Sequence, residues 1–357
     1  MLPKVLIIYT GGTFGMDIGS NERAPLALPR LSPKMLGKRL RDRVPELERI
    51  ARCDIEILMN RDSAHVGPDE WLLFAERIKA KWKKYDGIVL LHGTDTLCFT
   101  ASALSFLLRP CLKPVVITGA QRPLSALRTD ARRNLISAVE IVAHGPRSVV
   151  NQVSVFFDDR LMQGNRTRKR SASEFAAFES PRARPLAMVG TQIRYLRDDT
   201  SRGHRKSAGG GRLVPAFNRN IALMHVTPGF PSERVADGLL PNLDGLVLVI
   251  FPSGTAPTHD KAFIEMLRMA REEGMPVILV SEGASETSGN PGHYAAGAPL
   301  LAEGCLWAGE MTPECAFVKA SLLLGQPDGK VGFRKRWAKE LADEGLVKGR
   351  VSGDGKR

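Results

Sequence analysis

The sequence predicts an α/β protein, with a larger N-terminal domain that has a mostly parallel sheet flanked by helices, and a smaller C-terminal α/β domain. Short apolar runs typical of buried strands alternate with segments of helical periodicity, the pattern of parallel sheets with crossover helices. The chain has 357 residues, of which 43% are hydrophobic, enough for about two domains with cores of their own. Only 6% are aromatic, so we expect aliphatic cores.

The N-terminal domain, predicted over residues 1–196, contains the clearest elements. Strands are expected at Val5 to Tyr9, Ile55 to Met59, Gly87 to His92, Pro114 to Thr118 and Val153 to Phe157. One helix begins at Pro68, where a proline and two acids favour a helix start. Its expected buried face carries Trp71, Phe74, Ala75, Ile78 and Trp82. Further helices are expected after residue 96 and from Asp130 to Ala143.

The second half of the chain repeats the alternation on a smaller scale. Residues 197–214 have the glycine-rich composition of a linker, so we place the domain boundary there. The C-terminal domain, over residues 215–330, has an expected strand at Gly245–Phe251, a helix at Asp260–Glu273 and a strand at Pro276–Ser281. Residues 331–357 are expected to form a basic tail, with a short amphipathic stretch around Trp337 and Leu341.

Charge, cysteine content and the length of apolar runs argue against a nucleic-acid site, a metal site and a membrane segment. The net charge is +13, from 51 Lys and Arg against 38 Asp and Glu, and much of the excess lies in residues 182–212 and in the tail. Such segments are more often solvated surface than a nucleic-acid site. The five cysteines have no metal-ligand spacing, so we expect reduced thiols in a cytoplasmic protein and no metal site. No apolar run has the length of a signal or membrane segment.

The candidate site residues gather where predicted strands end. In chain order they are Thr13, Ser63, Thr94, Asp95, Ala120 and Asp158. The carboxyl ends of parallel strands meet at one edge of a sheet, so we expect a single crevice. A threonine hydroxyl reacts near neutral pH only with a base beside it and donors for the oxyanion. Lys169 is the candidate base, because repulsion from the arginines at 166, 168 and 170 favours loss of its proton.

Four segments of the chain stand out by their order and spacing: Tyr9–Thr13 (YTGGT), Leu91–Thr96 (LHGTDT), Thr118–Pro123 (TGAQRP) and Gly164–Lys169 (GNRTRK). Together they resemble the signature segments of the bacterial-type L-asparaginase family. The likeness runs from the first strand to about Leu324 and is strongest to the cytoplasmic type I branch. A lone T-G-G-T would be weak evidence, whereas four ordered segments are specific.

The resemblance implies an amidohydrolase that converts asparagine to aspartate and ammonia through a threonine acyl-enzyme. It also implies a homodimer or homotetramer that uses no cofactor. Thr13 would attack the side-chain amide. Lys169 would act on Thr94, which positions the attacking water.

Substrate binding follows from the same resemblance and from charge. A zwitterionic amino acid needs a carboxylate for its ammonium and neutral donors for its carboxylate, because a buried unpaired charge is costly. Asp95 would pair with the α-amino group and Ser63 would hold the α-carboxylate. Backbone groups of Gly12 and Ala120 would contact the substrate, with Ala120 lining the amide pocket.

Each of these residues has a structural alternative. Thr13 alone reads as a turn residue that caps a backbone group, and Asp95 as the N-cap of the following helix. Lys169 alone is one member of a basic loop. His92 is expected to be a satisfied core histidine rather than a catalyst. The combination of the four segments favours the functional interpretation.

The chain departs from the family pattern in the loop after the first threonine. The family carries a tyrosine in the loop after the first threonine, where its hydroxyl activates the nucleophile, and this chain has Arg23 there. Arginine cannot accept a proton. Three explanations stay open: another group is brought in by the loop, Arg23 acts electrostatically, or the protein is a weak or divergent amidohydrolase.

The alternatives to an asparaginase differ in substrate and partner. One is a glutaminase. Another is the amidase subunit of an archaeal-type glutamyl-tRNA amidotransferase, although that subunit has an additional N-terminal domain and the first strand here begins close to Met1. The third is a catalytically weakened amino-acid-binding homologue. We expect asparagine, or glutamine, as the small-molecule partner, and neither nucleic acid nor a membrane.

Overall fold

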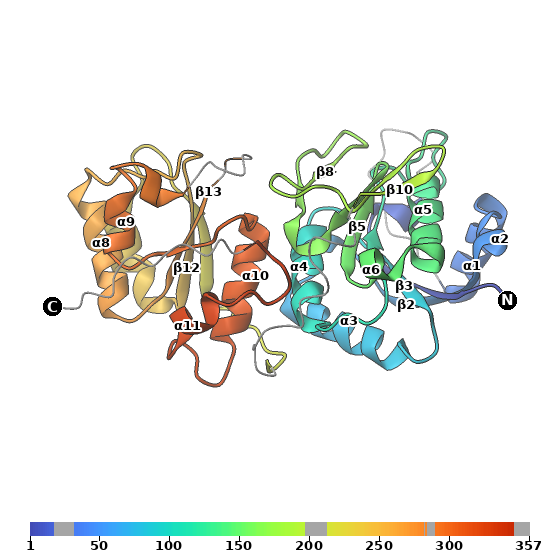
Figure 1. Cartoon of the computed structure of the whole chain (residues 1–357), viewed down its shortest axis with the longest axis horizontal. Coiled ribbons are helices and arrows are strands. Elements are labelled where there is room, and N and C mark those ends of the chain that lie inside the picture. Colours follow the sequence, from blue (N-terminus) through green and yellow to red (C-terminus); the bar gives the residue numbers. More distant parts are fainter. Residues whose placement is uncertain (18–31, 197–212, 282, 284–289, 346–357) are drawn as a thin grey trace. The chain divides into compact units, whose positions relative to one another are not determined.

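The computed structural model describes residues 1–17, 32–196, 213–281, 283 and 290–345. The chain divides into two compact units, Met1–Ala208 and Gly209–Arg357. Each unit is an α/β layer structure around its own main sheet (Figure 1). The predicted fold class is therefore confirmed. The proposed linker, residues 197–214, lies almost wholly outside the described residues, and the exact domain limits stay predictions.

The first unit is built on an eight-stranded sheet with the order β10-β9-β6-β5-β4-β3-β1-β2. The strands are β1 Lys4–Gly11, β2 Arg52–Arg61, β3 Gly87–Leu91, β4 Val115–Thr118, β5 Val153–Phe157, β6 Arg160–Gln163, β9 Ala187–Val189 and β10 Ile193–Tyr195. The first five, all predicted, pair in parallel. The last three are antiparallel additions that begin with the β5–β6 hairpin.

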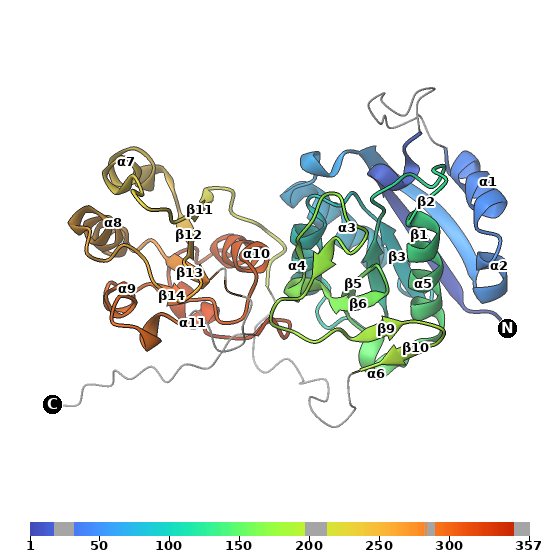
Figure 2. The same ribbon diagram turned by 90° about the horizontal axis from the view of Figure 1, so that it is seen from above.

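Helices cover both faces of this sheet. They are α1 Pro33–Arg43, α2 Leu47–Ile50, α3 Pro68–Lys81, α4 Leu97–Leu107, α5 Ala131–His144 and α6 Arg147–Val150. Figure 2 shows α3 and α4 on one side of the strands and α5 with α1 and α2 on the other. The core beneath α5 is mainly aliphatic, as expected. Trp82 is only half-buried, because α3 ends before it.

Short elements connect the strands to the site. These are the 3₁₀ turns η1 Thr13–Gly15, η2 Ser63–His65 and η3 Gly164–Arg166, and the small antiparallel pair of β7 Arg168–Lys169 and β8 Phe178–Glu179. The turns η1 and η2 follow the carboxyl ends of β1 and β2. The sheet order places β1 between β2 and β3, so the segments after these three strands are neighbours.

The second unit has a four-stranded parallel sheet, with strands in the order β11-β12-β13-β14. Its strands are β11 Ile221–His225, β12 Gly245–Ile250, β13 Val277–Ser281 and β14 Leu306–Trp307. Its helices are α7 Ser232–Gly238, α8 Lys261–Glu272, α9 Ala298–Ala302, α10 Pro313–Leu324 and α11 Phe333–Trp337, with 3₁₀ turns η4 Leu240–Asn242 and η5 Pro291–His293. Helices α7, α8 and α9 cover one face of the sheet, and α10 and α11 lie on the other (Figure 2).

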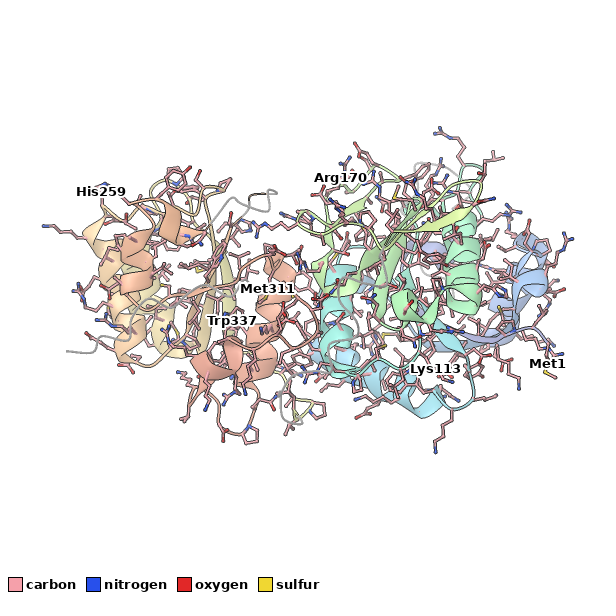
Figure 3. All side chains as sticks on the ribbon, in the orientation of Figure 1. Met1, Lys113, Arg170, His259, Met311 and Trp337 are labelled. Carbon is pink, nitrogen blue, oxygen red and sulfur yellow. The ribbon has the colours of Figure 1, made fainter. Side chains whose placement is uncertain are left out.

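A buried ion pair fastens the segment after α11 to α10. The Lys319 Nζ atom lies 2.6 Å from Glu344 Oε1, and both side chains are fully buried. The same ammonium donates to the carbonyls of Trp337 and Lys339, at 3.0 and 2.9 Å. Trp337, labelled in Figure 3, is itself buried. The segment expected to be a basic tail from residue 331 is therefore packed as far as Glu344.

No helix in the described ranges has both the length and the apolar character needed to cross a membrane.

Candidate active site

The turn after β1 carries Thr13 and can be made only by glycines. Gly11 and Gly12 have φ values of +117° and +79°, which side-chain-bearing residues rarely adopt. A Cβ on Gly11 would lie 2.0 Å from the Arg61 carbonyl oxygen, and one on Gly12 would lie 2.4 Å from Gly93 Cα. The turn that presents Thr13 therefore lies directly against the backbone that precedes Thr94.

The segments after β1, β2 and β3 meet at Ser63. A Cβ on Gly93 would lie 2.7 Å from Ser63 Oγ. The Asp95 amide donates to Ser63 Oγ at 3.3 Å, and the Thr96 hydroxyl donates to the Ser63 carbonyl at 2.7 Å. Ser63 is buried, and its hydroxyl keeps its own proton for a further acceptor. Gly12 and Ser63, both predicted site residues, thus contact the same stretch of backbone.

Lys169 joins the site from β7, in the segment that follows the β5–β6 hairpin. Its Nζ atom lies 2.7 Å from Thr94 Oγ1 and 2.7 Å from Asp95 Oδ1. The Lys169 side chain is 16% exposed and that of Asp95 is 68% exposed. An ammonium has three protons to donate, so it can serve the hydroxyl and the carboxylate together. Thr94, Asp95 and Lys169 are therefore brought into direct contact.

Two of the three arginines around Lys169 are engaged elsewhere. Arg166 donates to the Arg182 carbonyl at 2.6 Å, and Arg170 pairs with Glu174 at 2.6 Å. Figure 3 shows Arg170 beside the β7–β8 pair. The charge nearest to Lys169 is the Asp95 carboxylate, which opposes the repulsion expected from the neighbouring arginines.

His92 is held neutral inside the fold, in agreement with its expected role as a core histidine. Its Nδ1 atom lies 2.7 Å from the Gly93 carbonyl oxygen, which can only accept, so Nδ1 carries the proton. Its Nε2 atom accepts from the Thr100 hydroxyl at 3.0 Å, and Thr100 in turn accepts from the Trp71 indole at 3.1 Å. Burial lowers the pKa of His92 to about 4. His92 therefore supports the turn that precedes Thr94.

Ala120 follows β4 and is buried beside the same turn. A Cβ on the preceding residue, Gly119, would lie 2.3 Å from the His92 carbonyl oxygen and 3.7 Å from Thr94 Cγ2. The loop that continues from Ala120 also contacts the first turn, because the Leu124 amide donates to the Phe14 carbonyl at 3.2 Å. The loop after β4 thus adjoins both threonine-bearing segments.

Arg23, the residue at the position of the family's loop tyrosine, lies outside the described residues. The phenol closest in sequence is Tyr9, and it lies beneath the turn: a Cβ on Gly15 would lie 2.1 Å from its hydroxyl oxygen. That hydroxyl donates to Asn60 Oδ1 at 3.0 Å. Burial raises the pKa of Tyr9 well above its ordinary value, so the phenol stays neutral and supports the turn.

Asp158, also predicted at a strand end, has a structural role. It lies in the turn between β5 and β6, where it forms an ion pair at 2.7 Å with Arg133 of α5. Across the part of the chain that the structure describes, no group of three or more His, Cys, Asp or Glu side chains could hold a metal ion.

Two polar residues at the start of α5 adjoin the site, and the sequence pattern does not identify them as site residues. Asp130 and Asn134 are buried, and they bond to the backbone on both sides of Ala120. The sequence pattern predicts Asp130 only as the beginning of a helix. The available signal was an acid and an amide four residues apart, at positions that a helix buries against the sheet.

Comparison with known proteins identifies the family. Residues 4–201 match the family model of the N-terminal asparaginase domain, and residues 220–335 match that of the glutaminase/asparaginase C-terminal domain. The chain is 35% identical to L-asparaginase 1 of Escherichia coli over 350 residues, which covers 96% of this chain and 97% of that protein. It is 30% identical to a subunit of the glutamyl-tRNA(Gln) amidotransferase of Thermofilum pendens, covering 96% of this chain and 75% of that one.

A solved structure extends the similarity to the fold. The crystal structure of L-asparaginase I from Vibrio cholerae superposes with a TM-score of 0.83 at 33% sequence identity, covering 97% of this chain and 100% of that one. The likeness therefore includes both α/β units and nearly the full length. The chain belongs to the asparaginase family of amidohydrolases, and its likeness to type I enzymes confirms the branch that the sequence motifs indicated.

Proposed function

We propose that the protein hydrolyses L-asparagine to L-aspartate and ammonia through an acyl-enzyme on Thr13. The observation that carries the proposal is the Lys169 ammonium, which donates at 2.7 Å both to the Thr94 hydroxyl and to the Asp95 carboxylate. The contact between Gly12 and Gly93 brings the Thr13 turn against this group. Thr94, Lys169 and Asp95 thus form one group of reactive side chains, and Thr13 lies on the turn beside it. Such an arrangement suits an acyl transfer in two steps.

The reaction divides between the two threonines. In the first step the Thr13 oxygen bonds to the amide carbon, the C–N bond breaks, and ammonia leaves with the proton of the Thr13 hydroxyl. In the second step water attacks the acyl-enzyme, and aspartate leaves as the Thr13 oxygen regains a proton. Thr94, held by Lys169, is suited to orient that water and to pass its proton. The oxyanion would need backbone N–H donors beside the two threonines, other than that of Gly12, which already donates to the Arg61 carbonyl at 3.2 Å.

Charge complementarity supports an α-amino acid as the substrate. The exposed carboxylate of Asp95 is available to an incoming ammonium, and the Ser63 hydroxyl keeps a proton for a carboxylate. An asparagine that binds in this way would extend its side-chain amide toward Ala120 and the two threonines. Assembly as a homodimer or homotetramer and location in the cytoplasm are proposed from the resemblance to type I enzymes.

An ammonia-release assay tests the proposal directly. With asparagine as substrate we expect Thr13→Ala and Lys169→Met each to lower kcat by about a thousand-fold, because each removes a group needed in the chemical steps. Thr227→Ala and Lys261→Met make the same changes at exposed positions in the second unit and should leave kcat within about two-fold. Wild-type protein that releases no more ammonia than the Thr13→Ala variant would end the proposal.

A second candidate is the amidase of a tRNA-dependent amidotransferase. The relatives of that name and the net charge of +13 favour it. The same assay with glutamine, with and without tRNA, distinguishes the two functions. An asparaginase releases ammonia from asparagine at a rate that tRNA leaves unchanged, whereas an amidotransferase amidase is stimulated by tRNA on glutamine. Tight binding of aspartate in calorimetry without turnover would instead indicate a weakened binding homologue.

A further inference from the structure

The loop after β4 is held by two buried side chains at the start of α5, that of the N-cap residue Asp130 and that of Asn134. The Asp130 carboxylate accepts from the Gln121 amide at 2.9 Å and from the Arg122 amide at 3.0 Å. The Asn134 side-chain amide donates to the Gly119 carbonyl at 3.1 Å and to Asp130 Oδ2 at 3.2 Å. We call Asp130 and Asn134 the α5 clamp. Helix α5 packs on β1, β3, β4 and β5, so the clamp is built on the core of the unit.

The clamp fixes the peptide units on both sides of Ala120. In a trans peptide the C=O and N–H groups point in opposite directions. The Gly119 carbonyl points to the clamp, so the Ala120 N–H points away from it. The Gln121 N–H also points to the clamp, so the Ala120 carbonyl points away too. Among the described residues the only cis peptide is Arg109–Pro110, so both units are trans.

The backbone of Ala120 therefore presents one donor and one acceptor on the side away from α5. A carboxamide has the complementary pair, with N–H groups that donate and a carbonyl that accepts. Gly119 lies against Thr94 Cγ2 and the His92 carbonyl, which places this part of the loop beside Thr94, the threonine that orients the water in the proposed mechanism. The clamp also provides hydrogen-bond partners within the protein for the Gly119 carbonyl and for the Gln121 and Arg122 amides.

We infer that Asp130 and Asn134 are positioning residues for amide hydrolysis: they aim the Ala120 carbonyl at the amide nitrogen of the substrate. The inference rests on the proposed function. The amide N–H groups need an acceptor as the C–N bond breaks, and a carbonyl fixed in advance supplies it without reorganisation. An ester of the same acid has no N–H on its leaving group, so its hydrolysis does not need this acceptor.

Comparison of an amide with an ester isolates the role of the clamp. Asparagine and the β-methyl ester of aspartate share the α-amino and α-carboxylate groups and the acyl group, and they differ in the leaving group. The variants are Asp130→Asn, which keeps the shape but removes one acceptor, and Asn134→Ser, which removes both donated hydrogen bonds. Asp159→Asn is the matched control, because it makes the same change on a neighbouring hairpin where the side chain pairs with Arg133.

We expect kcat/KM for asparagine to fall by about ten-fold or more relative to kcat/KM for the ester, since one misdirected hydrogen bond of about 1.4 kcal/mol corresponds to a factor of ten. The loss should appear mainly in kcat. Equal losses on the two substrates, or no loss, would overturn the inference. If Asn134→Ser fails to fold, the isosteric Asp130→Asn decides by the same comparison. Wild-type protein that hydrolyses neither substrate would instead refute the proposed function, and the role of the clamp with it.

Discussion

His92 shows how a single buried side chain couples the site to solution conditions. Both ring nitrogens have partners, and the chain of hydrogen bonds from Trp71 through Thr100 to the Gly93 carbonyl works only for the neutral ring. A second proton on Nε2 would meet the Thr100 hydroxyl, whose own proton would have to turn away. The low pKa of about 4 follows from burial and agrees with this geometry.

The stability of the protein should therefore carry an acid-sensitive contribution from His92. In the unfolded chain a histidine has a pKa of about 6.5. Above this value the residue is neutral in both states and contributes no pH dependence. Between about pH 6.5 and 4 the unfolded state takes up a proton that the folded state excludes, so the free energy of unfolding falls by up to about 3 kcal/mol. Urea denaturation of wild type and His92→Gln between about pH 7.5 and 4.5 measures the difference.

In that experiment His92→Gln should flatten the loss of stability toward acid, whatever its cost at neutral pH. The control is His259→Gln, which changes an exposed histidine of the second unit, labelled in Figure 3. Its pH profile should follow that of the wild type. Parallel profiles for wild type and His92→Gln would contradict the assignment of His92 as neutral in the fold.

At the scale of elements, the site depends on close backbone contact between turns that are distant in sequence. The turns after β1 and β3 touch at Gly12 and Gly93, and the turn after β2 adds Ser63. None of these contacts leaves room for a side chain between the backbones. Glycine is therefore required at these positions for two reasons: the backbones are too close for a Cβ atom, and Gly12 has a positive φ.

Gly93→Ala should therefore damage activity strongly. Its Cβ would lie 2.7 Å from both Ser63 Cβ and Ser63 Oγ, so the turns must separate by several tenths of an ångström. We expect kcat/KM for asparagine to fall by about a hundred-fold, since small displacements of reacting groups have effects of this size. Gly238→Ala places the same methyl group where nothing lies within 4 Å and should keep its activity. Steady-state kinetics on both variants test this prediction. If Gly93→Ala is as active as Gly238→Ala, the close contact between the turns at Gly93 and Ser63 is contradicted.

The elements that could be predicted from the sequence carry a local signal in their residue pattern, and the elements that could not be predicted lack one. Strands β3 to β5 are buried on both faces and read as continuous apolar runs, and the N-terminal signals of α3 were clear. Helix α10 is buried almost all round, so it has no polar face and no helical periodicity to detect. Strands β6 to β10 are two to four residues long, too short for a pattern. Their positions depend on tertiary contacts.

The site follows the same division. Residues at strand ends could be predicted because parallel topology brings those ends together, and the contact of Lys169 with Thr94 is the one that the resemblance implied. Asp130 and Asn134 could not, because their role depends on the direction in which the loop after β4 returns to α5. Nor does any local pattern indicate that Arg166 and Arg170, near Lys169 in the sequence, bind partners of their own.

At the scale of the whole molecule, each unit completes its own core, and in the second the completion comes late in the chain. Glu344 is fully buried, and it also accepts amide protons from Leu341 and Ala342, at 2.9 and 2.7 Å. Lys319 lies in the middle of α10, over the ring of Trp337. The segment from α11 onward is thus part of the folded unit although its composition is that of a polar tail.

Removal of one partner of this pair should destabilise the second unit severely. Glu344→Ala leaves a buried ammonium without its counter-charge, so we expect the free energy of unfolding to fall by about 3 kcal/mol or more. The double variant Lys319→Met, Glu344→Leu should recover only part of the loss. It removes the unpaired buried charge, but the amides of Leu341 and Ala342 and the carbonyls of Trp337 and Lys339 lose the hydrogen bonds that the pair provides. Glu265→Ala, which breaks an exposed pair with Arg268, should change stability by less than about 1 kcal/mol. Thermal unfolding of the three variants would refute a structural role for the pair if Glu344→Ala behaves like Glu265→Ala.

The order of strands in the first sheet has a consequence for how the protein is synthesised. Strand β1 lies between β2 and β3, and β4 and β5 then add outward in the order in which they leave the ribosome. The proposed site residues accordingly emerge in sequence, Thr13 first and Lys169 last. A nascent chain already carries Thr13 long before residue 169 emerges, so no chain shorter than this contains the complete set of proposed site residues.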